Sequence, residues 1–290
     1  MSTASADAYY VPHGTYWPII GSIGLSTTVI GLANALHGSS FTMMFVGIAI
    51  IIFMMWGWFG QVISESEAGM YNDQVDMSFR WGMGWFIFSE VMFFGAFFGA
   101  LFYARMFSIP WLGGAGNNDA TAALLWPDFQ ATWPLISVPA AEKFSEAKEA
   151  MGAWGLPALN TVILLTSGAT VTWAHHALKK NDRKALVLGL FLTVVLGFLF
   201  VGLQAWEYSH AISELNLTLN AGIYGTTFYM LTGFHGFHVT MGATMLLVIL
   251  IRAMKGHFTP EKHFAFEAVA WYWHFVDVVW LGLFIFVYWI

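Results

Sequence analysis

The stretch Trp271-Tyr272-Trp273-His274-Phe275-Val276-Asp277 places a histidine and an aspartate three residues apart inside a long apolar segment. Six further segments are as apolar, and each reaches the length of about 20 residues that a helix needs to cross a bilayer. A charged side chain at the centre of a bilayer costs about 3 kcal/mol on insertion scales. A membrane helix that keeps His274 and Asp277 is therefore expected to supply partners for them.

The composition predicts a membrane protein with several spans. Hydrophobic residues make up 58% of the chain and charged residues only 10%, whereas soluble domains have about 25% charged residues. The chain has no cysteine, which excludes thiolate metal sites, disulfides and thiol chemistry. The net charge of −6 comes without a basic tract, so no nucleic-acid partner is expected.

The apolar segments predict an all-α membrane protein with seven spans. These are expected at Tyr16–Leu36, Phe41–Ile63, Ser78–Phe107, Pro157–Leu178, Ala185–Tyr208, Tyr224–Met254 and Phe266–Ile290. The predicted parts are an N-terminal segment 1–15, a two-helix hairpin 16–63, an inner loop 64–77, and a five-helix bundle 78–290 with an outer loop 108–156. The glycine pairs Gly21/Gly24 and Gly95/Gly99 are expected to allow close contact between helices. Composition leaves open whether the outer loop covers a neighbour or folds back on the bundle.

The distribution of lysine and arginine predicts the orientation. Connections after the second, fourth and sixth spans hold Arg80, Lys179, Lys180, Arg183, Lys184, Arg252, Lys255 and Lys262. The opposite side holds Arg105, Lys143 and Lys148. Since basic residues favour the cytoplasmic side, the N-terminus is expected inside and the C-terminus outside.

Five ionisable residues are predicted to form a buried polar layer. With 1.5 Å of rise per residue, all of them fall roughly 12–21 Å from a span end, near the middle of the membrane. They are Glu90, His235, His238, His274 and Asp277. Three hypotheses fit these residue types: a metal or haem site, a proton relay, or hydrogen bonds that join helices. The residues alone favour the hydrogen bonds and leave the other two open.

Other polar residues are expected at the membrane surfaces. An inner cluster suited to anionic lipid headgroups contains Trp56, Trp58, Glu65, Arg80, Arg252, Lys255 and His257. His175 and His176 are adjacent and point to different helix faces, so they are expected to chelate poorly and to serve an interfacial role. Glu207 and His210, near the outer end of the fifth span, are expected to reach water.

Five stretches resemble, in the same order, one family: subunit III of the haem-copper oxidases, specifically of aa3-type cytochrome c oxidase in its bacterial form. The stretches are Ser89–Phe94, Thr172–Leu178, Gln204–Tyr208, Thr232–Val239 and Phe266–Trp280. The resemblance implies a two-helix hairpin and a five-helix bundle separated by a V-shaped, lipid-filled cleft. It also implies that the chain has no catalytic residue, metal or other cofactor of its own, since haem and copper belong to partner subunits I and II.

The resemblance gives the site residues particular roles. Glu90 occupies the position of the family's carbodiimide-reactive carboxylate. Trp58, Glu65, Glu90, Arg252, Lys255 and His257 match or adjoin positions that bind phospholipid in the family. The five buried ionisable residues are then expected to be structural and related to proton uptake. The implied partners are subunit I as the main contact, subunit II, small subunits, phospholipids, and cytochrome c as donor to the complex.

The implied function is that of a non-redox subunit in a proton-pumping terminal oxidase, which stabilises subunit I, binds lipids, and supports proton uptake and O2 access. The expected location is the bacterial inner membrane, because the outer loop is longer than in animal mitochondrial proteins; the alternative is the mitochondrial inner membrane. A quinol oxidase subunit is a second candidate, although such subunits commonly lack the first hairpin. A secondary proton or ion transporter is a third, which the lack of an inverted repeat disfavours.

Overall fold

The structure confirms an all-α membrane protein with seven long apolar helices. The computed structural model describes residues 10–11, 14–139 and 143–290, and this described part contains no strand. The long helices are α1 Trp17–Leu36, α2 Thr42–Glu67, α3 Asp73–Tyr103, α6 Leu156–Lys179, α7 Arg183–Ser213, α8 Gly222–Lys255 and α9 Phe264–Leu283. Three further elements, the π-helix η1 Ala104–Ser108 and the short helices α4 Ile109–Leu112 and α5 Asp119–Leu125, follow α3, and the π-helix η3 Phe284–Trp289 extends α9.

The predicted inner loop 64–77 is wrong in its extent. Helix α2 continues to Glu67 and α3 already begins at Asp73, so only residues 68–72 connect them. The polar residues at these helix ends can face water while their backbone groups stay paired within the helix, so the hydrophobic boundary does not mark the end of the helix. Asp73 and Asp76 lie in the first turn of α3, where negative charge favours the helix dipole.

Two compact units make up the chain, residues 1–81 and 82–290. The first unit contains the α1–α2 hairpin and the beginning of α3. In the hairpin the backbones approach closely at Gly31, where a Cβ atom would meet the backbone of Met43 and Met44, and at Gly47, where it would meet Thr28. The hairpin predicted from the short turn after α1 is therefore a glycine-mediated contact.

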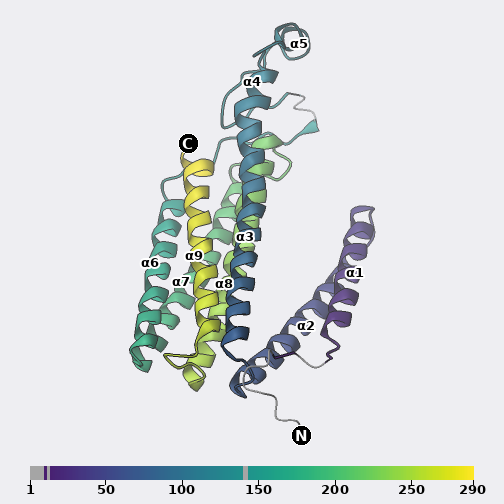
Figure 1. Ribbon diagram of the computed structural model, residues 1–290. Helices are drawn as coiled ribbons and strands as arrows, with labels where there is room; N and C mark the ends of the chain where they lie inside the picture. The colour runs from purple at the N-terminus through teal and green to yellow at the C-terminus, as the bar shows by residue number, and fades with distance from the viewer. Residues whose placement is uncertain (1–9, 12–13, 140–142) are drawn as a thin grey trace. The chain divides into compact units, whose positions relative to one another are not determined.

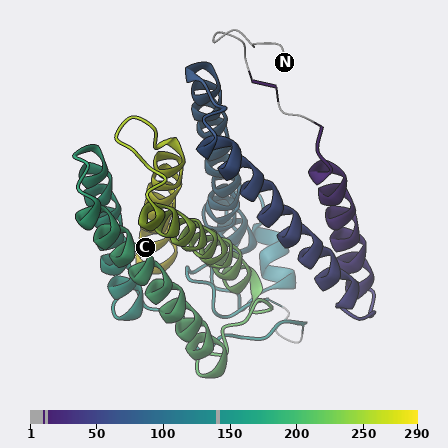
Figure 2. The same cartoon turned by 90° about the horizontal axis from the view of Figure 1, so that it is seen from below.

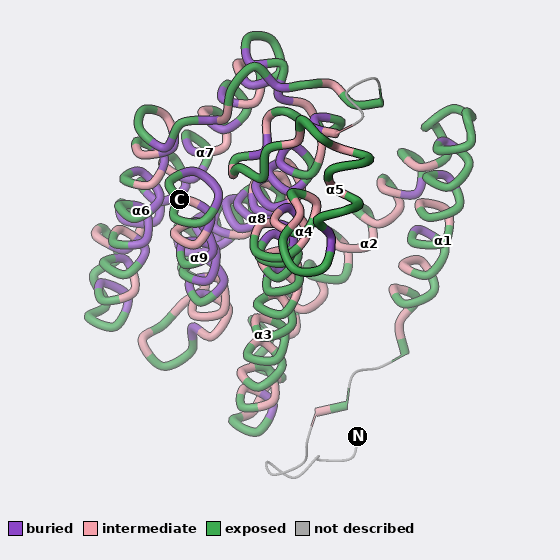
Figure 3. Tube along the Cα trace, turned by 90° about the horizontal axis from the view of Figure 1, so that it is seen from above, coloured by how far each residue is buried: buried purple, intermediate pink, exposed green. Residues whose placement is uncertain are grey.

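The second unit is built around α6, α7, α8 and α9. Each of these helices packs against the next in the chain, and α6 also packs against α9 (Figures 1 and 2). The centre holds fully buried Trp273 and Trp280 of α9, with Phe200 of α7. In the most apolar 18-residue windows of these four spans, 39–50% of residues are buried, against 11% in that of the α3 span. In Figure 3, buried residues are frequent along α6 to α9, whereas α3 is mostly exposed.

Within the second unit, α3 packs against α8 and α9 through aromatic side chains. Phe93 lies edge-on to Phe234 with 5.0 Å between the ring centroids, and Phe94 lies 6.0 Å from Phe275. Phe86 stacks on Tyr272 at 6.1 Å. Gly95 and Gly99, predicted to mediate close helix contacts, have no atom within 4 Å of their Cβ positions among the described residues of this unit, so no helix contact within the unit uses this pair. The contacts of α3 within this unit are made by the phenylalanine rings instead.

The second half of the long outer loop folds back on the bundle. The backbone N–H of Lys148 donates to Leu215 O at 2.8 Å, and that of Ser145 donates to Asn220 O at 3.1 Å. The Asn216 amide donates to Glu146 O at 2.7 Å. This part of the loop is thus fixed to the connection between α7 and α8.

Candidate functional site: buried polar contacts and the inner helix ends

Glu90 of α3 pairs with His238 of α8. Glu90 Oε2 lies 2.8 Å from His238 Nε2, and the other ring nitrogen, Nδ1, lies 2.6 Å from the carbonyl oxygen of Phe234. A carbonyl only accepts, so Nδ1 carries hydrogen and one proton is shared between Nε2 and the carboxyl group. The two side chains are 21% and 9% exposed. This contact satisfies both groups and ties α3 to α8.

His235 lies one turn before His238 on α8 and is fully buried. Its Nε2 donates to the carbonyl oxygen of Val276 on α9 at 3.2 Å, and its ring packs on Trp280 and Phe200 at 5.1 and 5.7 Å. Its Nδ1 has no hydrogen-bond partner among the described residues. His235 therefore acts as a donor between α8 and α9 inside an aromatic cage.

His274 and Asp277 lie side by side on α9 and face α6. His274 Nδ1 is 3.5 Å from Asp277 Oδ2, and its Nε2 is 3.2 Å from Thr172 Oγ1 of α6. The Asp277 carboxylate contacts the Cβ position of Gly168, so a larger residue there would displace the carboxylate. The His274 side chain is 46% exposed, whereas that of Asp277 is 8% exposed.

The five predicted residues thus divide into three separate contacts. One joins α3 to α8, one joins α8 to α9, and one joins α9 to α6. No hydrogen bond between the three contacts occurs in the described part of the chain, and the five side chains do not form a common ligand set. The arrangement can hold four helices together through polar groups, each with its own local partner.

In the first unit, Glu65 accepts hydrogen bonds on both carboxylate oxygens. Gln61 donates to Oε1 at 2.8 Å and Tyr71 donates to Oε2 at 2.7 Å, while Trp17 Nε1 donates to Gln61 at 3.0 Å. Burial, followed by the hydrogen bond from its hydroxyl to Glu65, raises the pKa of Tyr71. Glu65, predicted as a lipid residue, therefore fastens the end of the hairpin.

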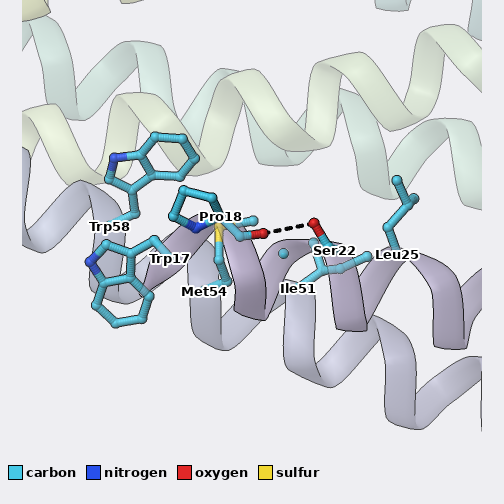
Figure 4. A pocket seen from close by; sticks show the side chains of 8 residues that line it. Trp17, Pro18, Ser22, Leu25, Ile51, Met54 and Trp58 are labelled. Atoms are coloured by element: carbon cyan, nitrogen blue, oxygen red, sulfur yellow. Dashed lines mark hydrogen bonds between the residues drawn. The ribbon is translucent and has the colours of Figure 1, made fainter. Parts of the chain in front are cut away.

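Trp58 lines an apolar groove between α1 and α2 (Figure 4). The groove has a volume of about 360 Å³. Its lining consists of Trp17, Pro18, Gly21, Ser22, Leu25, Ile51, Met54 and Trp58. The Ser22 hydroxyl donates to Pro18 O at 2.9 Å, so the groove offers mainly hydrocarbon surface. Such a surface suits an acyl chain rather than a headgroup.

The remaining predicted lipid residues lie at the end of α8. Arg252 is buried and its guanidinium carbon lies 4.7 Å above the ring of Phe258. Lys255 is exposed and ends the helix, and His257 follows Gly256, whose positive φ of 83° terminates α8. This end of the bundle combines a buried cation with an exposed one.

The sequence analysis missed the burial of a carboxyl group near the C-terminal end of α7. Glu207 is 1% exposed, so the expectation that it reaches water is wrong, whereas the His210 side chain is 41% exposed. Gln204 and Glu207 lie on one helix face and both face Tyr288 of η3. Their side-chain oxygens have no hydrogen-bond partner within the described residues. The three-residue spacing of Gln204 and Glu207 was the available signal, but the position in the span suggested solvent.

The side chains of the three helix-joining contacts lie in the stretches on which the family resemblance is based. Comparison with known proteins tests that resemblance. A family model described as cytochrome c oxidase subunit III matches residues 7–118 and 122–290. The chain belongs to the cytochrome c oxidase subunit III family.

Curated relatives agree with this membership along the whole chain. Cytochrome c oxidase subunit 3 of Anopheles gambiae is 41% identical over 290 residues, covering 100% of this chain and 99% of the relative. The protein of the same name from Carassius auratus is 40% identical over 285 residues, covering 98% and 97%. The family match confirms the predicted resemblance to cytochrome c oxidase subunit III. It places the chain among oxidase-complex subunits that cross a membrane several times.

Proposed function

We propose that this chain is the non-redox subunit III of a proton-pumping terminal oxidase that transfers electrons from cytochrome c to O2. The observation that carries the proposal is the family match over almost the whole chain. The buried ionisable side chains support the non-redox role, because they divide into three helix-joining contacts instead of converging on one point. The chain binds subunit I as its main partner and contacts subunit II.

Structural phospholipid is the second part of the proposal. The groove between α1 and α2 offers apolar surface for an acyl chain, with Trp58 at its wall. Arg252 and Lys255 place positive charge at the end of α8, where phosphate groups of anionic lipids are attracted. His257 follows them in the chain, and Glu65 and Glu90 complete the proposed set of lipid-related positions.

Proton uptake is the third part. The shared proton between Glu90 and His238 is held within the membrane region by a single short contact. A group of this kind influences the field around a neighbouring subunit's proton entrance without carrying electrons. The basic ends of α6, α7 and α8 define the cytoplasmic side in this proposal. The membrane is the bacterial plasma membrane, with the mitochondrial inner membrane as the alternative.

Purification of the chain from its native membrane tests the assignment. The chain is expected to co-purify with haem- and copper-containing subunits, and depletion of this chain is expected to leave haem and copper per complex unchanged. Loss of metal in proportion to the chain would contradict the non-redox role. Oxidation of quinol instead of cytochrome c would support the quinol oxidase alternative, and ion transport by the reconstituted chain alone would support a transporter.

Glu90→Gln tests whether the pair with His238 is needed for electron transfer. Glutamine keeps the size and can donate its amide N–H to His238 Nε2, so assembly is expected to persist. Oxygen consumption of the complex is expected to remain above about half of wild type, because no electron passes through this residue, while carbodiimide labelling of the chain falls. Ser89→Ala, an exposed neighbour bonded only to its own helix, is the matched control. Complete loss of oxygen consumption in an intact Glu90→Gln complex would contradict the proposal.

Arg252→Ala tests the lipid site at the end of α8. Removal of the buried guanidinium is expected to reduce the anionic lipid retained by the purified complex about tenfold, since about 1–2 kcal/mol of charge-assisted contact is lost. Lipid mass spectrometry of the purified complex provides the measurement. Lys262→Ala removes one exposed charge at the same end of the bundle and serves as the control. Equal lipid retention in both variants would remove Arg252 from the site.

A further inference from the structure

Three side chains from two helices meet near the end of α6 and the beginning of α9. His175 comes from α6, His263 directly precedes α9, and Glu267 lies in the first turn of α9. His175 Nε2 lies 3.4 Å from His263 Nε2 and 3.5 Å from Glu267 Oε1, and His263 Nε2 lies 3.2 Å from the same Oε1. Among the described residues, this is the group of histidine and acidic side chains whose ligand atoms converge closely enough for one metal ion.

The triangle formed by these three atoms has the size of a tetrahedral zinc face. Zinc binds histidine nitrogen and carboxylate oxygen at about 2.0–2.1 Å, which separates two ligand atoms in a tetrahedron by about 3.3–3.4 Å. The three observed separations of 3.2, 3.4 and 3.5 Å bracket this value. An ion can therefore bind without movement of the helices.

The ring of His263 is oriented for metal binding. Its Nδ1 lies 3.1 Å from the carbonyl oxygen of Thr259, so Nδ1 carries the hydrogen and the neutral ring directs the Nε2 lone pair at His175 and Glu267. This pattern, a backbone acceptor behind a metal-binding imidazole, is a common outer-shell arrangement. The ring of His175 rests against Phe266 at 5.3 Å, which limits its rotation.

The three side chains of the cluster are mostly enclosed by the protein. The side chains of His263, Glu267 and His175 are 8%, 13% and 22% exposed. Two imidazole nitrogens and a carboxylate oxygen in such surroundings need a proton or a cation between them. One carboxylate gives the site a formal charge of −1, which partly neutralises a divalent ion. The positive charge of Lys179, on the next turn of α6, opposes the binding of a cation.

We propose that His175 Nε2, His263 Nε2 and Glu267 Oε1 bind a zinc ion that clamps the end of α6 to the start of α9. Two imidazoles and one carboxylate suit Zn²⁺, and water or another external oxygen supplies the fourth ligand. The ion is colourless and has no redox chemistry, so the clamp is independent of the electron path. The proposal differs from the expectation, drawn from the family resemblance, that the chain holds no metal of its own.

Zinc titration of the purified full-length chain in detergent tests the site. After treatment with chelator, the chain is dialysed against ZnCl2 at a series of concentrations and zinc per chain is measured by mass spectrometry. One tight equivalent is expected for the wild-type chain, and the zinc affinity is expected to fall at least about 100-fold in His175→Asn and in Glu267→Gln. His176→Asn is the matched control, because its Nδ1 bonds to Thr172 O on its own helix and it does not join the cluster.

X-ray absorption at the zinc edge of the wild-type chain keeps the test decisive if a variant fails to fold. A first shell of nitrogen and oxygen at about 2.0 Å with imidazole scattering is expected. Absence of tight zinc in the wild-type chain, or equal binding in His175→Asn and His176→Asn, would overturn the proposal. Neither outcome bears on the oxidase assignment, since the clamp is argued from this chain's own geometry.

Discussion

The α1–α2 hairpin and the α6–α9 bundle join their helices by different contacts. Inside the hairpin, glycines bring the two backbones together, and its side-chain hydrogen bonds between helices lie at one end, at Gln61. In the bundle, hydroxyl, indole and imidazole groups bridge neighbouring helices along their length, as in the 2.9 Å bond from Trp273 to Ser167. In lipid no hydrophobic force drives helices together, so both close backbone packing and polar contacts can do this work. The comparison indicates that two helices can be held mainly by close packing with a polar contact at one end, whereas a bundle with several faces gains its specific arrangement from polar partners.

Among the variants that test this comparison, Gly31→Val is expected to have the largest effect, on the packing of the hairpin helices. The new side chain would occupy the space of the Met43–Met44 backbone, so the hairpin helices must separate, at a cost of about 3 kcal/mol or more. Because the chain has no native cysteine, a disulfide between cysteines placed at 21 and 54 reports the contact. Cross-linking is expected to drop severalfold in the Gly31→Val background.

Gly60→Val is the control for this experiment. Gly60 lies on α2, and no atom of the described hairpin comes within 4 Å of its Cβ position. The same substitution there is expected to leave cross-linking between positions 21 and 54 unchanged. Equal cross-linking in the Gly31 and Gly60 variants would show that the hairpin does not depend on close backbone approach.

Trp273→Ala is expected to cause the next largest effect, in the bundle. Trp273 is fully buried, lies over Gly197 and Gly242 with ring atoms 2.8 Å from both Cβ positions, and donates to Ser167. Loss of the indole leaves a cavity and removes one of the two hydrogen bonds of the Ser167 hydroxyl, which still donates to Leu164 O. The cost is expected to be about 3–5 kcal/mol. SDS titration of the purified chain measures the loss. Trp271→Ala, on the same helix but 37% exposed, is expected to change stability by less than about 0.5 kcal/mol.

Thr193→Val is expected to have a small effect and measures what one polar bridge contributes. Thr193 of α7 shares a 2.8 Å hydrogen bond with Thr170 of α6, and each hydroxyl also has a carbonyl partner on its own helix. Valine keeps the shape, so the cost is expected to be about 0.6 kcal/mol in the same SDS titration. Thr166→Val removes a hydroxyl bonded only within α6 and serves as the reference. A loss above about 2 kcal/mol for Thr193→Val alone would mean that bridges, more than packing, stabilise the bundle.

From the sequence, the candidate site could be predicted only in its residue types and their spacing along the chain. Glu90 and His238 were identified as buried ionisable groups, but 148 positions separate them and no local pattern pairs them. Glu207 was expected to be exposed to water because the end of its span was estimated from hydropathy. The neighbouring elements that bury it are known only from the tertiary structure. Gly95 and Gly99 have the spacing of a helix contact, yet within the described second unit α3 makes its contacts through phenylalanine rings and not at these glycines.

The sequence by itself determined the seven membrane helices, because runs of about 20 apolar residues have one stable arrangement in lipid, a helix with its backbone bonds paired internally. It also determined the family, through ordered stretches that the comparison confirms. Only the tertiary structure decided which polar groups meet. His175 was unremarkable beside His176 along the chain, and it gained His263 and Glu267 as neighbours when α6 packed against α9. Spacing along one helix fixes which face a side chain occupies, but the packing of a second helix decides what that face contacts.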